Sequence, residues 1–295
     1  MGQDIAWTSM NYVVGCFDLL GLSNALREFA LVPSEKAEQK KLGEVMGEAL
    51  LCVQNFREVF AQAVADFRTG CTDLEVTNGR LADGRDALKA LTDCAIREDQ
   101  FSDLVVVSGR LISSEGPVTV WPALATIAGS AITMIRALAS SSPFRGGIDV
   151  GVGSDWPGLE LLGSALVKAH ELELMAARWP RVVVGDVLIS FLLSFRRAAP
   201  NASVEARLNT YFAKQARGFV CRSGDGRWMV DFLGEALARM LMARPHANVY
   251  SGAVSQAFDF VRSQVKRFRR EHEDKLARRY QALERYFGAR LPLWQ

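Results

Sequence analysis

The chain has 295 residues, 49% hydrophobic and 23% charged, a composition typical of a soluble globular protein with one large domain or two modest ones. Its 35 basic and 33 acidic residues leave a net charge of +2, so charge indicates neither a nucleic-acid nor a membrane partner. The five cysteines are scattered without a CxxC pair and there are only three histidines, which argues against a zinc site.

The sequence predicts a cytoplasmic protein. No basic segment followed by an apolar core stands at the amino terminus, so we expect no signal peptide. The stretch "PALATIAGSAITMIRALA" is interrupted by hydroxyl residues and an arginine, and "VLISFLLSF" is far too short to span a bilayer. Scattered cysteines fit reduced thiols in the cytosol.

The first predicted strand lies in "NYVVGCFDLLGLSN", residues 11–24, and it ends at Asp18. Apolar residues at helical spacing predict a long amphipathic helix over residues 36–67. Residues 69–86 are rich in turn formers, so we expect a surface loop or hairpin there, with Asn78-Gly79 as its turn.

Residues 87–109 predict two short strands joined near Arg97 to Gln100, and the second strand begins with Asp103. A buried helix is expected over residues 119–141. The glycine-rich stretch "FRGGIDVGVG", residues 144–153, is expected to be a strand whose glycines permit close backbone approach.

Residues 158–180 predict an amphipathic helix, and residues 181–185 a short buried strand. One face of that helix is expected to carry Leu162, Leu166, Ala169, Leu172 and Ala176. This alternation predicts an α+β fold, in which helices pack on a mostly antiparallel sheet.

In the last 110 residues the sequence pattern is mainly that of helices. Helices are expected over residues 185–197 and 202–215, and a hairpin over 218–234 with its turn at Asp225-Gly226. Residues 253–287 predict a long charged helix, broken once, with an apolar face packed inward. We therefore expect a domain of residues 1–185 and a mainly helical extension of residues 186–295.

Two aspartates stand at the ends of predicted strands, Asp18 at the end of the first and Asp103 at the start of a later one. If these strands are antiparallel neighbours, both carboxylates fall at the same edge of the sheet. Two carboxylates at such a short distance repel each other unless a cation lies between them. Oxygen ligands of this kind suit Mg²⁺ or Mn²⁺ bound together with phosphates. Taken singly, each aspartate also fits a helix cap or a turn.

Four stretches carry a resemblance to a known family: "VVGCFDLLGLSN", "FSDLVVVSG", "FRGGIDVGVG" and "ELLGSALVKAHELELMAARWPRVVVG". In order and spacing they are similar to the catalytic domain of class III nucleotidyl cyclases, over roughly residues 10 to 185. The resemblance implies a ferredoxin-like α+β fold for the domain of residues 1–185.

The same resemblance implies a reaction and a set of ligands. Asp18, Leu19 and Asp103 would hold two Mn²⁺ or Mg²⁺ ions, with Asp18 and Asp103 as the catalytic residues. The ribose 3′-hydroxyl of a nucleoside triphosphate would attack the α-phosphate, giving a 3′,5′-cyclic nucleotide and pyrophosphate. The family also implies a homodimer with active sites at its interface.

The chain departs from the purine cyclases where the substrate would be contacted. Asp99 stands where those enzymes carry a base-reading lysine, and Glu160 replaces a base-reading aspartate. Val167 and Glu171 occupy the positions of the usual asparagine and arginine. The purine pocket is therefore absent from the sequence.

The chain looks most like the bacterial pyrimidine cyclases of the Pycsar antiphage systems, which make cyclic UMP or cyclic CMP. UTP is the favoured substrate and CTP the next. Two alternatives stay open: an adenylate or guanylate cyclase with an unusual pocket, and a non-catalytic cyclase-like regulator that only binds nucleotide. We expect neither nucleic acid nor membrane as a partner.

Several residues are candidates for binding the substrate. The backbone of Leu20 and Gly21 leads into a predicted helix whose amides could hold a triphosphate. Arg97 offers donors that match the uracil carbonyl oxygens, although a solvent-exposed turn arginine is equally expected there. Glu160 would face the base. Arg145 and Arg181 could supply positive charge to phosphate or pair with a structural carboxylate such as Glu171 or Glu173. His170 is expected to be an ordinary helix histidine.

Overall fold

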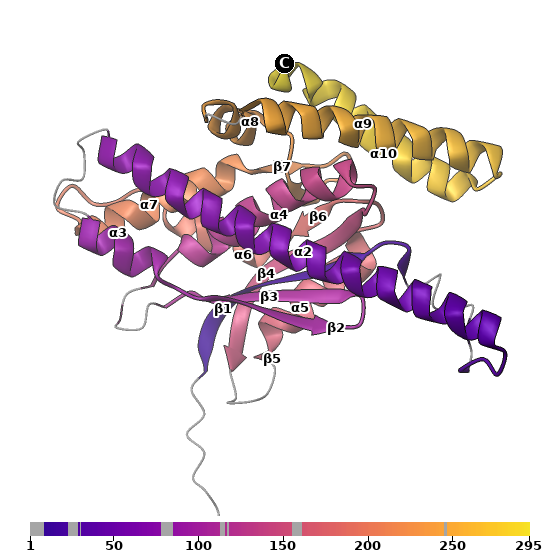
Figure 1. The fold of residues 1–295 in the computed structure, drawn as a ribbon. Helices are drawn as coiled ribbons and strands as arrows, with labels where there is room; N and C mark the ends of the chain where they lie inside the picture. Colours follow the sequence, from indigo (N-terminus) through magenta and orange to yellow (C-terminus); the bar gives the residue numbers. More distant parts are fainter. Residues whose placement is uncertain are drawn as a thin grey trace, which may run out of the picture.

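The computed structural model describes residues 9–22, 29, 31–77, 85–112, 116, 118–154, 161–244 and 247–295. Helices and strands are interspersed along the chain, often with two or three of one kind in succession (Figure 1). Short helical turns follow α5 and α10. In chain order the elements are β1 (Met10–Leu19), α2 (Lys36–Thr77), α3 (Arg85–Thr92), β2 (Ile96–Phe101), β3 (Leu104–Arg110), α4 (Trp121–Ala139), β4 (Phe144–Ser154), β5 (Leu162–Gly163), α5 (Ser164–Glu171), the π-helical turn η2 (Leu172–Ala176), β6 (Val182–Val184), α6 (Asp186–Ser194), α7 (Val204–Gly218), β7 (Val220–Arg222), β8 (Trp228–Val230), α8 (Glu235–Met242), α9 (Ala247–Arg270), α10 (Asp274–Arg290) and the 3₁₀ turn η3 (Leu291–Trp294).

One sheet organises the molecule, with strand order β2-β3-β1-β4-β6-β8-β7 and β5 paired to β4. All pairings are antiparallel except that of β4 with β6. The first four strands, with helices between β1 and β2 and between β3 and β4, follow the βαββαβ order of the ferredoxin-like fold. The predicted α+β class with a mostly antiparallel sheet is confirmed.

Helices cover the two faces of the sheet unequally. In Figure 1, α2 and α4 lie on one face and α5 lies on the other. The alternation of β1 directs Phe17 toward the first face and Cys16 toward the second, where each joins a separate apolar cluster. Four phenylalanines, with ring centroids 4.9 to 6.2 Å apart in the contacting pairs, form part of the first cluster: Phe17, Phe56, Phe60 and Phe144.

Helix α4 is buried almost all round because it packs against α2, α7 and α9 as well as the sheet. In the described part of the chain it is the one helix long and apolar enough to cross a membrane, and 89% of that apolar window is buried inside the protein. Its apolarity is that of a core helix.

The glycines of β4 permit the close backbone approach that the sequence predicted, and the backbone that approaches is that of α5 and η2. A Cβ atom on Gly147 would overlap the carbonyl oxygen of Ala169, and one on Gly151 would lie 2.9 Å from the amide nitrogen of Ala165. Glycine at these positions lets α5 and η2 lie directly on the sheet.

Three local predictions are wrong. Residues 69–77 continue helix α2 rather than forming a loop, because an established helix propagates through single turn formers at a cost of about 1 kcal/mol for a glycine; Asn78 and Gly79 lie outside the described residues. Residues 85–92 form helix α3 instead of a strand.

The third error concerns the β2–β3 hairpin, which turns at Ser102-Asp103 and not near Arg97 to Gln100. The polar stretch of β2 pairs with β3 because its carboxylates have partners. Glu98 lies 3.4 Å from Arg57 of α2, and Asp99 lies 2.9 Å from Arg97. Ser102 adopts the left-handed conformation with φ 59° that a two-residue turn requires.

The predicted helix over residues 158–180 is shorter than expected. Leu162 belongs to strand β5 and is exposed, whereas Ala169 and Ala176 face the sheet and are buried. The remaining predictions for this part, strand β6 and the buried helix α4, are confirmed.

The C-terminal elements form as predicted. The hairpin of β7 and β8 turns around Asp225 and Gly226, and the charged helix is interrupted between α9 and α10. Strand β8 pairs with β6, so this hairpin extends the same sheet, and one apolar core includes residues on both sides of position 185. The division into residues 1–185 and 186–295 stays a prediction, and the sheet and the apolar core both continue across it.

Candidate functional site

The two aspartates lie at the same edge of the sheet. Asp18 is the next-to-last residue of β1 and stands opposite Leu104 of β3, and Asp103 directly precedes Leu104 in the β2–β3 turn. The Leu19 amide donates a hydrogen bond to the Asp103 carbonyl oxygen at 3.2 Å, which ties the turn to the end of β1. The antiparallel pairing of β1 and β3 thus places both side chains at one corner of the molecule.

An arginine holds one of these carboxylates. Arg145, the second residue of β4, stands opposite Asp18 in the ladder, and its Nε donates to Asp18 Oδ2 at 2.8 Å. Its Nη2 lies 2.9 Å from Oε1 of Glu173 in the π-helical turn η2. Arg145 therefore bridges the strand end to the helix that covers the second face of the sheet.

Glu173 is a site residue that the sequence analysis considered only as an ion-pair partner. It is 3% exposed, and its Oε1, although close to Arg145, receives no well-aligned hydrogen bond. His170, half-exposed on α5, lies 3.9 Å from the other carboxylate oxygen of Glu173. A glutamate in a stretch of "ELELM" gives no local signal of burial. Only the π-helical turn, a feature often found at functional sites, distinguishes it.

Burial is the largest cause of the pKa shifts at this corner. Burial raises the pKa of Asp18, the hydrogen bond and charge of Arg145 lower it, and the charge of Asp103 raises it. Burial likewise raises the pKa of Glu173, with Arg145 opposing and the charges of Asp18 and Asp103 reinforcing the shift. Asp18 and Glu173 therefore share one arginine, the charge of Asp103 acts on both, and the site has a surplus of negative charge that a cation would offset.

The two aspartates can hold Mg²⁺ or Mn²⁺ only if the substrate and water supply the remaining oxygen ligands. Within the described residues, no group of three or more His, Cys, Asp or Glu side chains is arranged to hold a metal ion. Two carboxylates completed by substrate phosphates and water are the usual protein contribution to a magnesium site. Leu19 can contribute only its backbone carbonyl oxygen, because a leucine side chain has no donor atom.

The backbone beyond Asp18 is less open to phosphate than the sequence suggested. The Leu20 amide donates to the carbonyl oxygen of Pro143 at 2.9 Å, so it already has an acceptor. Gly21 is exposed and has φ 101°, a conformation that favours glycine. Residues 23–28, which follow Gly21 and Leu22 where a phosphate-binding helix was expected to begin, lie outside the described residues.

Arg97 lies away from the two aspartates of its own chain. It pairs with Ser108 in the β2–β3 ladder, four residues from Leu104, or about 13 Å along the strand at roughly 3.3 Å per residue. Its guanidinium contacts Asp99 at 2.9 Å, and it lines a cavity of about 390 Å³ with Tyr12 and Arg110.

The remaining candidates divide into exposed, buried and undescribed residues. Val167 and Glu171 are exposed on α5. Arg181 is 1% exposed and bonded to Ala176 O, Ser223 Oγ and Asp225 Oδ2, so its place is structural; the predicted partners Glu171 and Glu173 do not bind it. Glu160 lies outside the described residues.

Comparison with known proteins adds little to this geometry. No protein-family model matches the chain, and no curated protein matches it. Among solved structures, a bacterial light-regulated adenylyl cyclase is similar with a TM-score of 0.37 and 12% identity, over 63% of this chain. The chain spans 46% of the length of that protein. At so low a TM-score the similarity carries no argument, and the functional reasoning rests on the site.

Proposed function

We propose that the protein is a nucleotide cyclase that converts UTP into 3′,5′-cyclic UMP and pyrophosphate. The observation that supports this is the placement of Asp18 and Asp103 at one corner of a ferredoxin-like sheet, within electrostatic reach of each other. In the proposed reaction the ribose 3′-oxygen forms a bond to the α-phosphorus, the bond to the β-phosphate oxygen breaks, and pyrophosphate leaves with its electron pair. The hydroxyl proton passes to water.

Asp18, Asp103 and the backbone of Leu19 would hold two Mg²⁺ or Mn²⁺ ions. When bound, such ions lower the pKa of the 3′-hydroxyl and offset the charge of the phosphates. The chain contributes the carboxylates at the edge of the sheet, and the nearby Glu173 is buried from water.

Arg145 has two partners in the described fold, and one of them is the proposed ligand Asp18. For Asp18 to bind a cation through both of its oxygens, the guanidinium would give up Oδ2. Glu173 would keep Arg145 near the site during that exchange, and the released Nε and Nη groups would then face phosphate oxygens, which guanidinium groups bind well. Arg145 is therefore assigned to the substrate phosphates.

The base contact requires a second copy of the chain. Arg97 stands too far along its hairpin to reach a base bound at Asp18 and Asp103 of the same chain, so in the proposed homodimer each active site receives Arg97 from the other copy. Val167, Leu174 and Met175, each more than half exposed on α5 and η2 beside the site, favour such a partner surface. The carbonyl oxygens of uracil match the arginine donors, which is why UTP is preferred over CTP.

The biological role follows from the resemblance alone. A cyclic pyrimidine nucleotide made in the bacterial cytoplasm would act as a second messenger in antiphage defence of the Pycsar type.

The direct test is turnover of the full chain with Mn²⁺ and each of UTP, CTP, ATP and GTP, with products identified by mass. We expect cyclic UMP and pyrophosphate in equal amounts, with UTP the best substrate. A purine cyclic nucleotide as the main product would identify the chain as an adenylate or guanylate cyclase. Binding of nucleotides without pyrophosphate release would identify a non-catalytic regulator, a reading favoured by the engagement of Asp18 with Arg145.

A further inference from the structure

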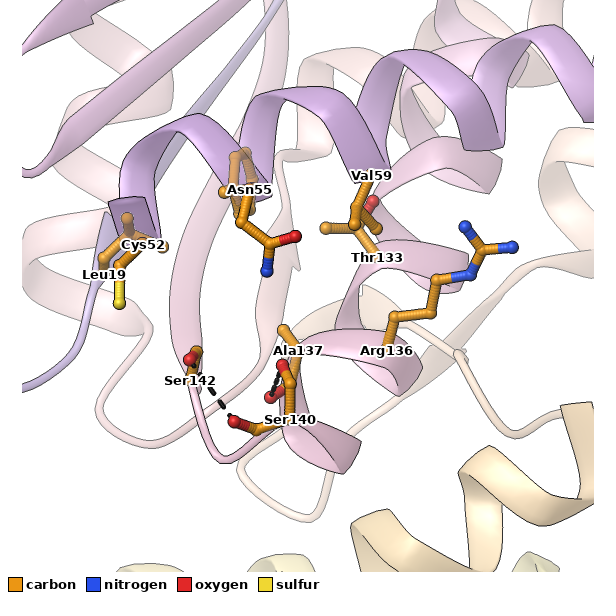
Figure 2. Close-up of a pocket in the computed structure, with 10 residues that line it drawn as sticks. Leu19, Cys52, Asn55, Val59, Thr133, Arg136, Ala137, Ser140 and Ser142 are labelled. Carbon is orange, nitrogen blue, oxygen red and sulfur yellow. Dashed lines mark hydrogen bonds between the residues drawn. The ribbon is translucent and has the colours of Figure 1, made fainter. Parts of the chain in front are cut away.

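A cavity of about 160 Å³ lies between helices α2 and α4, on the face of the sheet opposite Arg97 (Figure 2). Each helix lines it with residues three, four and seven positions apart, which is one helical face. The lining from α2 is Cys52, Asn55, Phe56 and Val59, and the lining from α4 and its C-terminal end is Thr133, Arg136, Ala137 and Ser140, with Leu19 and Ser142 closing the end.

The two helices are close together at one point and leave space at another. At Gly129 a Cβ atom would lie 2.8 Å from a methyl carbon of Val64 and 3.1 Å from the ring of Phe60, so α2 and α4 are in direct contact there. One turn further along α4, from Thr133 to Ser140, the side chains leave the cavity between the helices unfilled. The cavity opens to solvent, because Asn55 and Ser140 in its lining are exposed, and a ligand of matching shape would displace water from its apolar walls.

Two polar groups in the cavity lack the partners that buried groups normally have. Thr133 is 1% exposed and lines the cavity, and its Oγ1 has no hydrogen-bond partner in the described structure. Arg136 is half-buried with its guanidinium 5.9 Å from the ring of Tyr250, and no carboxylate of the described residues forms an ion pair with it. Figure 2 shows Asn55 projecting from α2 into the same space.

We propose that this cavity binds a small organic monocarboxylate whose apolar body is about the size of a benzene ring. A cavity of about 150 Å³ lined by apolar side chains accommodates benzene, which sets the size of the body. The apolar part would contact Phe56, Val59 and Ala137. The carboxylate would accept hydrogen bonds from Asn55 and Thr133 Oγ1, and Arg136, whose guanidinium points away from Asn55 in Figure 2, would turn toward the carboxylate and neutralise its charge.

The position of the cavity gives the ligand a route to the candidate active site. The Leu19 side chain closes one end of the cavity, and the Leu19 backbone follows Asp18 and bonds Asp103. An occupant would therefore restrain the end of β1. Binding itself does not depend on the proposed cyclase activity, because none of the cavity residues other than Leu19 belongs to that site.

The test uses the full chain and benzoate, with benzyl alcohol as an uncharged molecule of the same shape. Calorimetric titration is expected to give one saturable benzoate site with a dissociation constant of about 1 mM or tighter. Arg136→Gln should weaken the affinity for benzoate about 10-fold, because a charged hydrogen bond is lost, and should leave the affinity for benzyl alcohol nearly unchanged. Arg278→Gln, an exposed arginine of α10 far from the cavity lining, should change neither.

A second variant and a local probe keep the proposal testable if Arg136→Gln does not fold. Val59→Phe fills the cavity and keeps the arginine, so it should abolish binding of both molecules. Alkylation of Cys52, mapped by mass spectrometry, should slow with benzoate, whereas alkylation of Cys94, which lines a different cavity, should not. Absence of saturable benzoate binding up to about 10 mM, equal affinity in Arg136→Gln, or equal slowing at both cysteines would overturn the proposal.

Discussion

Arg145 Nε donates a 2.8 Å hydrogen bond to Asp18 Oδ2 across the β1–β4 ladder, and the same guanidinium reaches Glu173. A residue of β4 thus connects the end of the first strand to the helix on the second face of the sheet. Removing the arginine would leave the buried Glu173 and the half-buried Asp18 facing each other without a cation.

We expect Arg145→Gln to lower the free energy of unfolding by about 2–4 kcal/mol near neutral pH, because it leaves buried negative charge uncompensated. Arg145→Gln combined with Glu173→Gln should recover a large part of that loss. Urea denaturation of the single and double variants, analysed as a double-mutant cycle, measures the interaction. Equal stability of Arg145→Gln and the parent would show that this ion pair contributes nothing.

The aspartates themselves are predicted to matter for turnover and not for folding. Asp18→Asn and Asp103→Asn should each reduce product formation by about 100-fold or more, because each removes a negative ligand at the reacting phosphates. Circular dichroism and size-exclusion chromatography should show unchanged fold and assembly. Asp93→Asn, an exposed aspartate that pairs with Arg68, is the matched control and should retain activity. Full turnover by either site variant would exclude the two-metal reaction.

Asp225 makes the stability of the folded protein depend on pH in the acid range. The side-chain hydrogen bond from buried Arg181 lowers the pKa of Asp225 from 3.8 to about 2. The unfolded chain therefore binds this proton more readily than the native state, so the stabilisation is present above pH 3.8 and is lost as the pH falls toward 2.

Asp225→Asn should accordingly be less stable than the parent near neutral pH, with the difference shrinking across that acid range. Urea denaturation midpoints of Asp225→Asn and the parent, measured over a pH series, would show this shrinking difference. Glu271→Gln, which removes one partner of an exposed pair with Arg267, should shift the midpoint little at any pH. A difference for Asp225→Asn that stays constant with pH would contradict the assignment.

Gly147 is predicted to be the glycine on which the second face of the sheet depends. A Cβ atom there would overlap the Ala169 carbonyl oxygen and lie 2.7 Å from the Glu173 amide nitrogen, both backbone atoms that cannot rotate away. Gly147→Ala should destabilise the protein by about 1–3 kcal/mol by forcing α5 and η2 off the sheet. Gly224→Ala, with nothing within 4 Å of the added carbon, is the control in thermal unfolding. Equal melting temperatures for the two variants would contradict this packing.

The first 185 residues are predicted not to fold alone. Asn209 of α7 accepts a hydrogen bond from the Val120 amide at 2.8 Å and donates to the Val118 carbonyl at 2.7 Å, at the start of the core helix α4. Removing residues 186–295 would also expose the edge of β6 and the face of α4 that packs on α7 and α9. The expressed fragment should aggregate or lack cooperative unfolding. A cooperative urea transition of the fragment would show that the division at residue 185 is a true domain boundary.

The sequence by itself determined most of the local elements and their order. Helical spacing located α2 and α4, turn chemistry located the hairpin at Asp225-Gly226, and the glycines of β4 indicated a close approach of backbone. These features follow from periodicity and backbone preference within about ten residues, so they can be read without knowing the fold. The same local rules misplaced the β2–β3 turn, because the charges of β2 are satisfied by Arg57 and Arg97 rather than by solvent.

Only the tertiary structure decided which distant residues meet. The pairing of Asp18 with Arg145 joins positions 127 residues apart, and Glu173 becomes part of the site only because η2 is buried against β4. The extension of the sheet by β8 and the cavity between α2 and α4 likewise depend on how separate elements pack. Contacts of this kind arise from the shape and burial of surfaces that are brought together by folding, and no local pattern of residues encodes them.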